Sequence, residues 1–163
     1  MQNLKDIPCL ILGIGNILWA DEGFGVRVVE AFNDKYAFTD PNNVIADGGT
    51  LGMYLYDRIC RAEKLLIFDC CDFKGKPGEL RVLRNDDVKL WTSTKISPHQ
   101  TGMNDLLVAA AVRGAVPKEI AVVGFQPILL DDYGGSLSPE AKANIDEAVR
   151  DGYEIVRGWN VGL

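Results

Sequence analysis

Short apolar runs alternate along this chain with longer amphipathic segments, and this alternation restricts the possible folds more than any other feature. Four runs are continuously apolar, as buried strands are: residues 9–14, 44–46, 65–68 and 120–125. A fifth run, residues 79–84, partly alternates, which is typical of an edge strand with one wet face. Strands separated by helices need crossover connections, so the pattern predicts a three-layer α/β/α fold with a twisted, mostly parallel sheet of about five strands.

Four amphipathic segments between these runs are predicted to be helices, because their apolar residues recur on one face. Asp21, Thr50 and Ser138 are the expected N-caps of the first, second and fourth helices. A proline directly after Ser138 supports the last of these starts. The third helix is expected over residues 101–112.

Composition bounds the class of protein. With 163 residues and 47% apolar side chains, we expect a single domain over residues 1–163. The net charge of −6 argues against a nucleic-acid binder, which needs a basic face. The longest apolar stretch, residues 8–20, is too short to span a bilayer and does not resemble a secretory signal. Four cysteines without Cys-x-x-Cys spacing are typical of reduced thiols, so we expect a cytoplasmic protein with no membrane insertion.

Polar residues follow several of the predicted strands. In open α/β sheets, ligands bind at the carboxyl ends of the strands, because the crossover loops converge there. Carboxylates from four loops are expected on this rim, with the only histidine of the chain beside them. The residues concerned are Asp21, Glu22, Asp47, Asp69, His99, Asp131 and Asp132.

Glu22, Asp69 and His99 together offer two carboxylates and one imidazole. This donor set suits a divalent transition metal with open coordination positions. Asp69 closes a buried strand, where a carboxylate must be hydrogen-bonded, paired or metal-bound. Glu22 could instead favour the dipole of the following helix, and His99 could be a solvated loop residue or a helix cap.

Other motifs are weaker. Gly13 and Gly15 form an incomplete dinucleotide-binding pattern, and a tight turn is the favoured interpretation. Two glycines near the start of the first helix, Gly23 and Gly25, indicate a close approach to the backbone. No His-Glu-x-x-His or Gly-x-Ser-x-Gly motif occurs. A cysteine hydrolase with His99 as its base stays open, although small buried thiols are the favoured interpretation of the cysteines.

Taken together, these motifs resemble those of the hydrogenase maturation endopeptidases. The matching segments are residues 12–27, 47–50, 69 and 95–100, in the order of that family. Residues 19–20, 126–127 and 131–136 are most similar to the branch that serves membrane-bound uptake nickel–iron hydrogenases. The resemblance covers nearly the whole chain, from about residue 10 to the last helix.

The resemblance implies an α/β peptidase with one physiological partner, the precursor of the hydrogenase large subunit. Family members remove a C-terminal extension from that precursor after nickel insertion. Carried over by motif, the metal ligands are Glu22, Asp69 and His99. The expected metal is nickel carried by the substrate, for which zinc or cadmium could substitute in crystals, and we expect no other cofactor. We also expect a monomer.

Asp47 is the expected catalytic carboxylate, in an aspartic-type endopeptidase. It could orient a water or hold the peptide, or it could only fix the turn at Gly48 and Gly49. Gly48, Gly49 and Thr50 are the expected substrate-binding residues. Two alternatives stay open: a zinc-dependent aminopeptidase or amidase-like metallohydrolase, and a non-catalytic α/β ligand-binding module. Cys70 and Cys71 lie beside Asp69, where a thiolate would compete as a softer ligand.

Overall fold

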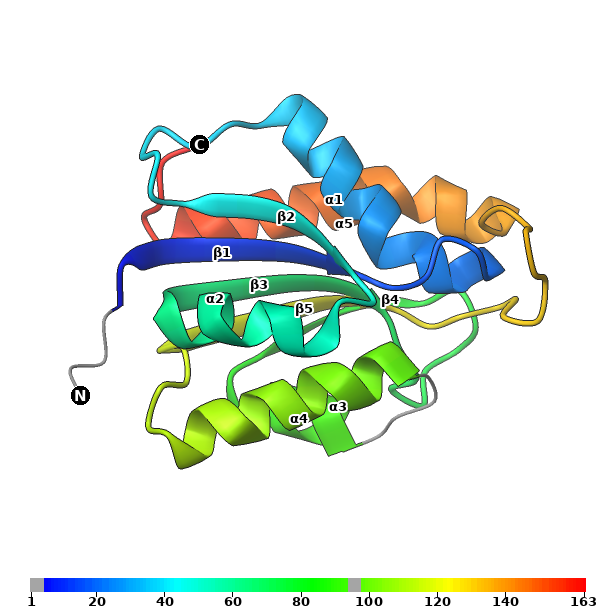
Figure 1. The fold of residues 1–163 in the computed structure, drawn as a ribbon. Helices are drawn as coiled ribbons and strands as arrows, with labels where there is room; N and C mark the ends of the chain where they lie inside the picture. Colours follow the sequence, from blue (N-terminus) through cyan, green and yellow to red (C-terminus); the bar gives the residue numbers. More distant parts are fainter. Residues whose placement is uncertain (1–4, 94–97) are drawn as a thin grey trace.

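The computed structural model describes residues 5–93 and 98–163, although the side chains of residues 90–93 and 98–101 lie outside that description. A twisted sheet of five strands lies between two helical layers (Figure 1). The strands are β1 (Ile7–Ile14), β2 (Val44–Gly49), β3 (Ala62–Cys70), β4 (Leu80–Arg84) and β5 (Glu119–Phe125). The helices are α1 (Phe24–Lys35), α2 (Tyr56–Arg61), α3 (Asp86–Ser93), α4 (Pro98–Val112) and α5 (Pro139–Gly158), with short 3-10 turns η1 (Ala20–Gly23) and η2 (Gly52–Leu55).

The strand order is β2-β1-β3-β5-β4, and all neighbouring pairs are parallel except β4 with β5. This confirms the mostly parallel sheet and the edge position of the strand expected at residues 79–84. β2 forms the other edge, and its residues 44–46 are only partly buried, unlike the fully covered strand expected there. A short apolar run does not distinguish an edge strand from a covered strand, because the two kinds of strand can have similar lengths and similar apolar content.

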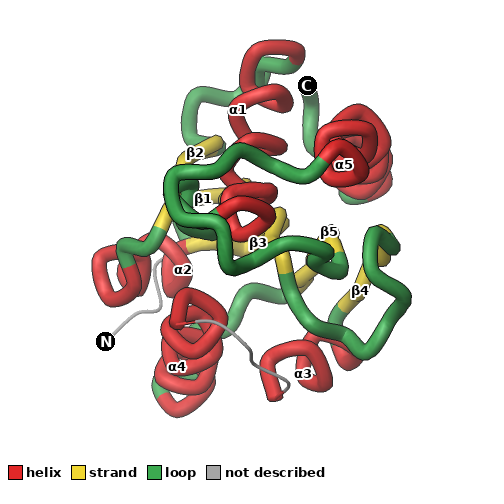
Figure 2. Tube along the Cα trace, turned by 90° about the vertical axis from the view of Figure 1, so that its right-hand side faces the viewer, coloured by secondary structure: helices red, strands yellow, loops and turns green. Residues whose placement is uncertain are grey.

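The core has two halves because successive strand residues face opposite sides of the sheet. Leu10 and Leu12 of β1 pack toward α2 and α4, whereas Ile11 packs toward α1 and α5. Figure 2 shows the two helical layers on either side of the strands. Cys70 and Cys71 belong to opposite halves, as the strand alternation predicts. Among the described residues, no helix has the length and apolarity needed to cross a bilayer.

The helix starts agree only in part with the sequence. Ser138 caps α5 as expected, since its Oγ accepts a hydrogen bond from the backbone N–H of Ala141 at 3.2 Å. The caps expected at Asp21 and Thr50 are wrong. Each helix there is preceded by a 3-10 turn, and at the described N-cap positions of η1, α1, η2 and α2 no side chain makes a capping bond. The sequence also missed α3, and the third predicted helix begins earlier, at Pro98.

Glycines let the first turn of α1 press against the sheet. A Cβ on Gly25 would overlap the carbonyl oxygens of Ile14 and Phe68, the residues that end β1 and precede Asp69 in β3. Gly15 has a φ of +139°, and a Cβ there would overlap the carbonyl oxygen of Glu22. The expected tight turn and close backbone approach are therefore both present, and they bring η1 to the carboxyl ends of β1 and β3.

Replacing Gly25 with alanine should separate α1 from these two strand ends. Because the methyl group meets backbone oxygens that cannot rotate away, we expect a loss of about 3 kcal/mol in the free energy of unfolding. Urea unfolding followed by circular dichroism measures this loss. Gly158→Ala is the matched control, since a Cβ at Gly158 meets nothing within 4 Å. Equal stability of the two variants would contradict the packing argument.

Candidate functional site

The loops at the carboxyl ends of the parallel strands converge on one side of the molecule. Figure 1 shows the segment between β1 and α1 beside the long segment that connects β5 to α5. Backbone hydrogen bonds join the two: the N–H of Asp21 donates to the carbonyl of Leu129 at 3.0 Å, and that of Gly134 donates to Leu18 at 2.7 Å. The candidate site is therefore built on two segments separated by more than 100 positions in sequence.

Asp21 is the link between these segments. Its side chain is fully buried and accepts hydrogen bonds from the backbone N–H groups of Ile128, Leu129 and Ser138, at 3.0, 3.0 and 2.7 Å. The Ser138 hydroxyl donates a further bond to it at 3.0 Å. Hydrogen-bond donors and the N-terminal end of α5 thus stabilise this carboxylate, in a position the sequence had assigned to a helix cap.

An aromatic contact covers the same junction from outside. Trp19 and Tyr133 form an isolated antiparallel β-bridge, and their rings meet edge to face with centroids 5.0 Å apart. Between Trp19 and Asp21, Ala20 has a φ of +42°, in the left-handed region that non-glycine residues rarely adopt. Contacts on both sides of Ala20 hold the backbone in this strained conformation and fix the direction in which η1 leaves β1.

Glu22 and Asp69 are brought to the same end of the sheet. Glu22 lies in η1 and is partly buried, with its backbone packed on Gly15, while Asp69 is fully buried near the end of β3. Burial raises the pKa of the Cys70 thiol, and the charges of Asp69, Asp21 and Glu22 raise it further. The three carboxylates therefore lie near Cys70, at the carboxyl end of β3.

His99 cannot be placed with these carboxylates. Its backbone belongs to the first turn of α4, but its side chain lies outside the described residues. Among the side chains that are described, no three His, Cys, Asp or Glu residues are arranged to hold a metal ion. The metal-binding role of all three residues therefore stays a prediction, and the structure shows only that Glu22 and Asp69 lie at the same end of the sheet.

The end of β2 and the loop directly after it contain the other predicted site residues. Asp47 pairs in register with Gly13, and its side chain is exposed, with Oδ1 at 3.4 Å from the position a Cβ would take on Gly49. Thr50 is exposed as well. Gly48 is buried instead, and a Cβ there would lie 2.7 Å from Cδ1 of Ile14, so tight packing accounts for this glycine. Asp47, Gly49 and Thr50 are the members of this loop that a substrate could reach.

Gln126, which follows the last strand, binds the loop after β3 through its side chain, a role that the sequence did not predict. Its Oε1 accepts hydrogen bonds from the N–H groups of Phe73 and Gly75 at 3.1 and 3.2 Å, and its Nε2 donates to Asp72 at 3.1 Å. Lys74, which donates to the same carboxylate, lowers the pKa of Asp72. The loop after β3 is thereby fixed against β5.

The cysteines are buried thiols, as expected. Burial raises the pKa of Cys9 to about 12 and raises that of Cys70 as well. A thiol with a raised pKa carries little thiolate at neutral pH, so it is a poor nucleophile. This argues against the cysteine hydrolase that the sequence left open.

Comparison with known proteins identifies the family. The family model described as hydrogenase maturation protease matches residues 26–155. The chain belongs to the hydrogenase maturation protease family. Because the members of this family are peptidases, the membership argues against the non-catalytic α/β ligand-binding module that the sequence left open.

Individual relatives match a larger share of the chain than the family model does. The hydrogenase expression/formation protein HupD of Bradyrhizobium diazoefficiens is 43% identical over 158 residues, covering 96% of this chain and 82% of that protein. HoxM of Azotobacter vinelandii is 46% identical over 148 residues, covering 90% and 71%. The solved structure of the hydrogenase maturating endopeptidase HybD from Escherichia coli superposes with a TM-score of 0.88 at 36% identity, over 96% of each chain.

Replacing Asp21 with asparagine should loosen the junction between η1 and the segment before α5 in this maturation protease. The amide nitrogen would face backbone donors that now meet a carboxylate oxygen, so we expect a loss of about 3 kcal/mol in the free energy of unfolding. Denaturant unfolding measures it. The control is Asp131→Asn, because Asp131 is exposed on the same segment. A loss no greater than that of the control would show that the buried carboxylate is dispensable.

Alkylation tests the interpretation of the thiols. Because the four cysteines are buried, iodoacetamide at pH 8 should label less than one thiol per folded chain, and all of them after unfolding in urea. Mass spectrometry of the two samples gives the count. Rapid labelling of Cys70 in the folded protein, with loss of peptidase activity, would restore the cysteine hydrolase hypothesis.

Proposed function

We propose that this protein removes the C-terminal extension from the precursor of a nickel–iron hydrogenase large subunit, after nickel has entered the precursor. The observation that carries the proposal is the membership of the maturation protease family, joined to the two carboxylates, Glu22 and Asp69, on the rim of the sheet. A peptidase that cuts one bond in one protein needs a recognition signal besides the peptide sequence. Substrate-bound nickel supplies such a signal.

Glu22, Asp69 and His99 are the proposed ligands of that nickel. Carboxylate oxygens and imidazole nitrogen are donors that suit divalent first-row metals. Crowded carboxylates at a buried strand end favour a cation for the same electrostatic reason that they raise the pKa of Cys70. Docking of a loaded precursor would bring its metal ion beside these carboxylates, which would couple recognition of the metal to recognition of the peptide.

Asp47 is the proposed catalytic carboxylate. Its side chain is exposed at the end of β2, so it can accept a proton from a water or hold a peptide N–H. Gly49, the last residue of β2, and Thr50, directly after it, are the proposed contacts for the substrate backbone. A Lewis-acidic nickel on the precursor would polarise the scissile carbonyl or a bound water.

Exposed apolar side chains near the rim support a protein substrate. Large apolar residues are seldom gathered at the surface without an interaction role, and aromatic residues dominate the binding energy of many interfaces. Those on the loop before η1 and on the segment after β5 are Ile17, Leu18, Trp19, Ile128, Leu129 and Tyr133. We propose that the precursor docks against this group while its C-terminal segment reaches Asp47.

We further propose that the protein acts in the cytoplasm as a monomer. Four buried thiols suit a reducing compartment. The compartment is open to a direct check by fractionation, and the oligomeric state by light scattering.

The decisive experiment is incubation of the purified protein with nickel-loaded precursor, followed by mass spectrometry of the product. We expect loss of a C-terminal fragment, and no cleavage of precursor made without nickel. Treating the protease with a chelator and desalting it should leave cleavage unchanged, because the metal arrives on the substrate. His99→Ala and Glu22→Gln should each reduce kcat/KM by at least about 100-fold, as loss of a ligand-orienting or metal-binding group does.

Glu154→Gln is the matched control for Glu22→Gln. Glu154 is an exposed carboxylate of α5 whose ion pair with Arg157 involves none of the residues proposed to bind the metal or the precursor. Cleavage should be unchanged in this variant. If the chelated protease is inactive and zinc restores it, the metal belongs to the protease, and the zinc-dependent metallohydrolase alternative takes the place of this proposal.

A further inference from the structure

A small apolar pocket opens beside the Asp47 loop. It has a volume of about 110 Å³ and lies between the loop after β2 and the start of α4. Its walls come from four elements or their connecting loops, and they are Ile14, Gly49, Thr50, Leu55, Met103 and Leu106, with Gly52 and Gly102 at the same place. Met103 and Leu106 are almost fully buried, so they form a fixed apolar floor.

We propose that this pocket is a specificity subsite that receives one aliphatic side chain of the substrate next to the scissile bond. The inference rests on the proposed function, because it takes the substrate to be an extended peptide held at Asp47. Gly49 and Thr50 line the pocket and follow Asp47 by two and three positions. A peptide that reaches the carboxylate therefore passes the pocket mouth.

The size of the pocket selects the occupant. Ligand sites for whole small molecules usually measure about 300–1,000 Å³, which is far larger. An apolar cavity of about 150 Å³ accepts a benzene ring, so this pocket admits one branched aliphatic side chain and excludes an indole. Because the walls that the structure describes are mostly apolar and carry no charged side chain, a charged side chain would lose its hydration there without gaining an ion-pair partner.

Three glycines keep the mouth open for a peptide backbone. Gly49 and Gly52 have φ angles of +45° and +51°, which turn the loop around the pocket. Gly102 lies on α4, where the nearest heavy atom to an added Cβ would be Cα of Gly52 at 3.9 Å. Glycine in place of alanine costs a helix about 1 kcal/mol. Helix stability therefore does not explain Gly102, whereas the need to keep the pocket mouth open for a peptide does.

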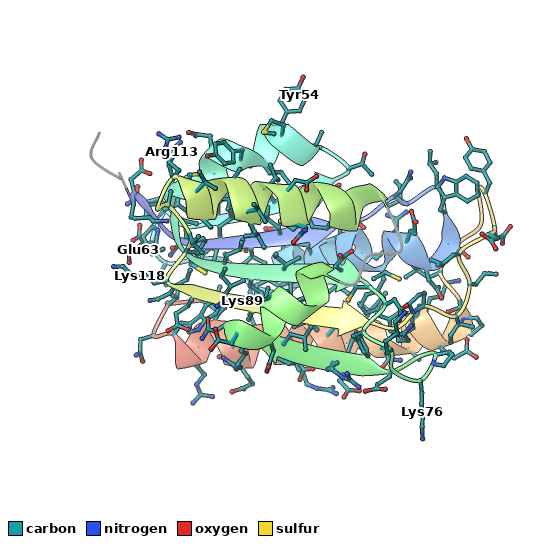
Figure 3. All side chains as sticks on the ribbon, turned by 90° about the horizontal axis from the view of Figure 1, so that it is seen from below. Tyr54, Glu63, Lys76, Lys89, Arg113 and Lys118 are labelled. Atoms are coloured by element: carbon teal, nitrogen blue, oxygen red, sulfur yellow. The ribbon has the colours of Figure 1, made fainter. Side chains whose placement is uncertain are left out.

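The rest of η2 does not compete for the pocket. Leu55 points into the core, whereas Tyr54 is 86% exposed and stands out from the surface (Figure 3). On the opposite side, Ile14 forms one wall, and its carbonyl oxygen abuts Gly25 at the start of α1. The end of β1 therefore contacts both the pocket and the start of α1, the element that packs beside Glu22 and Asp69.

The test uses the variant Gly102→Leu with a panel of precursors. Each residue within four positions of the scissile bond is replaced in turn, by alanine and by aspartate, in nickel-loaded precursor. With the unmodified protease, replacing the side chain at one apolar position of the precursor should lower kcat/KM by about 10–200-fold. Gly102→Leu should lower kcat/KM for the unmodified precursor at least about tenfold. With this variant, truncating the side chain at that same precursor position should change kcat/KM no further, because the introduced leucine already fills the pocket.

Gly158→Leu is the control, because Gly158 is also helical and a Cβ there meets nothing within 4 Å. It should cleave every precursor as the unmodified protease does. Thermal unfolding checks that Gly102→Leu is folded, and Gly102→Ala gives a milder block with no steric risk. The subsite proposal is wrong if folded Gly102→Leu cleaves the precursor normally. It is also wrong if Gly102→Leu lowers kcat/KM by the same factor for every precursor in the panel. If the unmodified protease cuts no loaded precursor, the proposed function itself fails.

Discussion

One buried carboxylate holds the functional end of this protein together. Asp21 accepts hydrogen bonds from a serine hydroxyl and from three backbone N–H groups, all contributed by residues 128–138. Taking a carboxylate out of water costs several kcal/mol unless donors replace the lost hydration, and here four donors do so. The same contacts fix η1, with Glu22, against the segment that carries Tyr133. The geometry of the rim therefore depends on a residue that need not touch the substrate.

Close backbone packing is the second constraint, and it explains why glycine occurs where helix propensity disfavours it. Gly25 lets α1 contact the ends of β1 and β3, and Gly15 lets the loop after β1 contact the carbonyl of Glu22. Any side chain at these positions would push η1 away from β3, where Asp69 lies. Glycine lowers the stability of the first turn of α1, but it allows Glu22 and Asp69 to lie at the same end of the sheet. Functional sites commonly break a local rule in this way.

The two sides of the rim have different chemistry. Glu22 and Asp69 concentrate negative charge near Cys70, whereas the side that faces α4 is an apolar pocket on which Met103 and Leu106 form the floor. Asp47 is exposed near the end of β2, two positions before Gly49 of the pocket wall. In the proposed function, metal recognition and peptide recognition use separate surfaces that meet at the end of β1. A peptide without nickel, or nickel without the peptide, would engage only half of them.

The sequence by itself determined the layered fold, the strands and the edge position of β4, because apolar runs and amphipathic spacing act locally. It also indicated Glu22, Asp47 and Asp69 as rim residues, since strand ends converge in parallel sheets. Only the tertiary structure decided the role of Asp21, which looked like a helix cap, because its partners lie 107–117 positions away. The same holds for the pocket beside Gly49, whose walls come from distant parts of the chain. Local patterns record which face of a segment is buried, whereas cavities and long-range hydrogen bonds arise only when the segments pack.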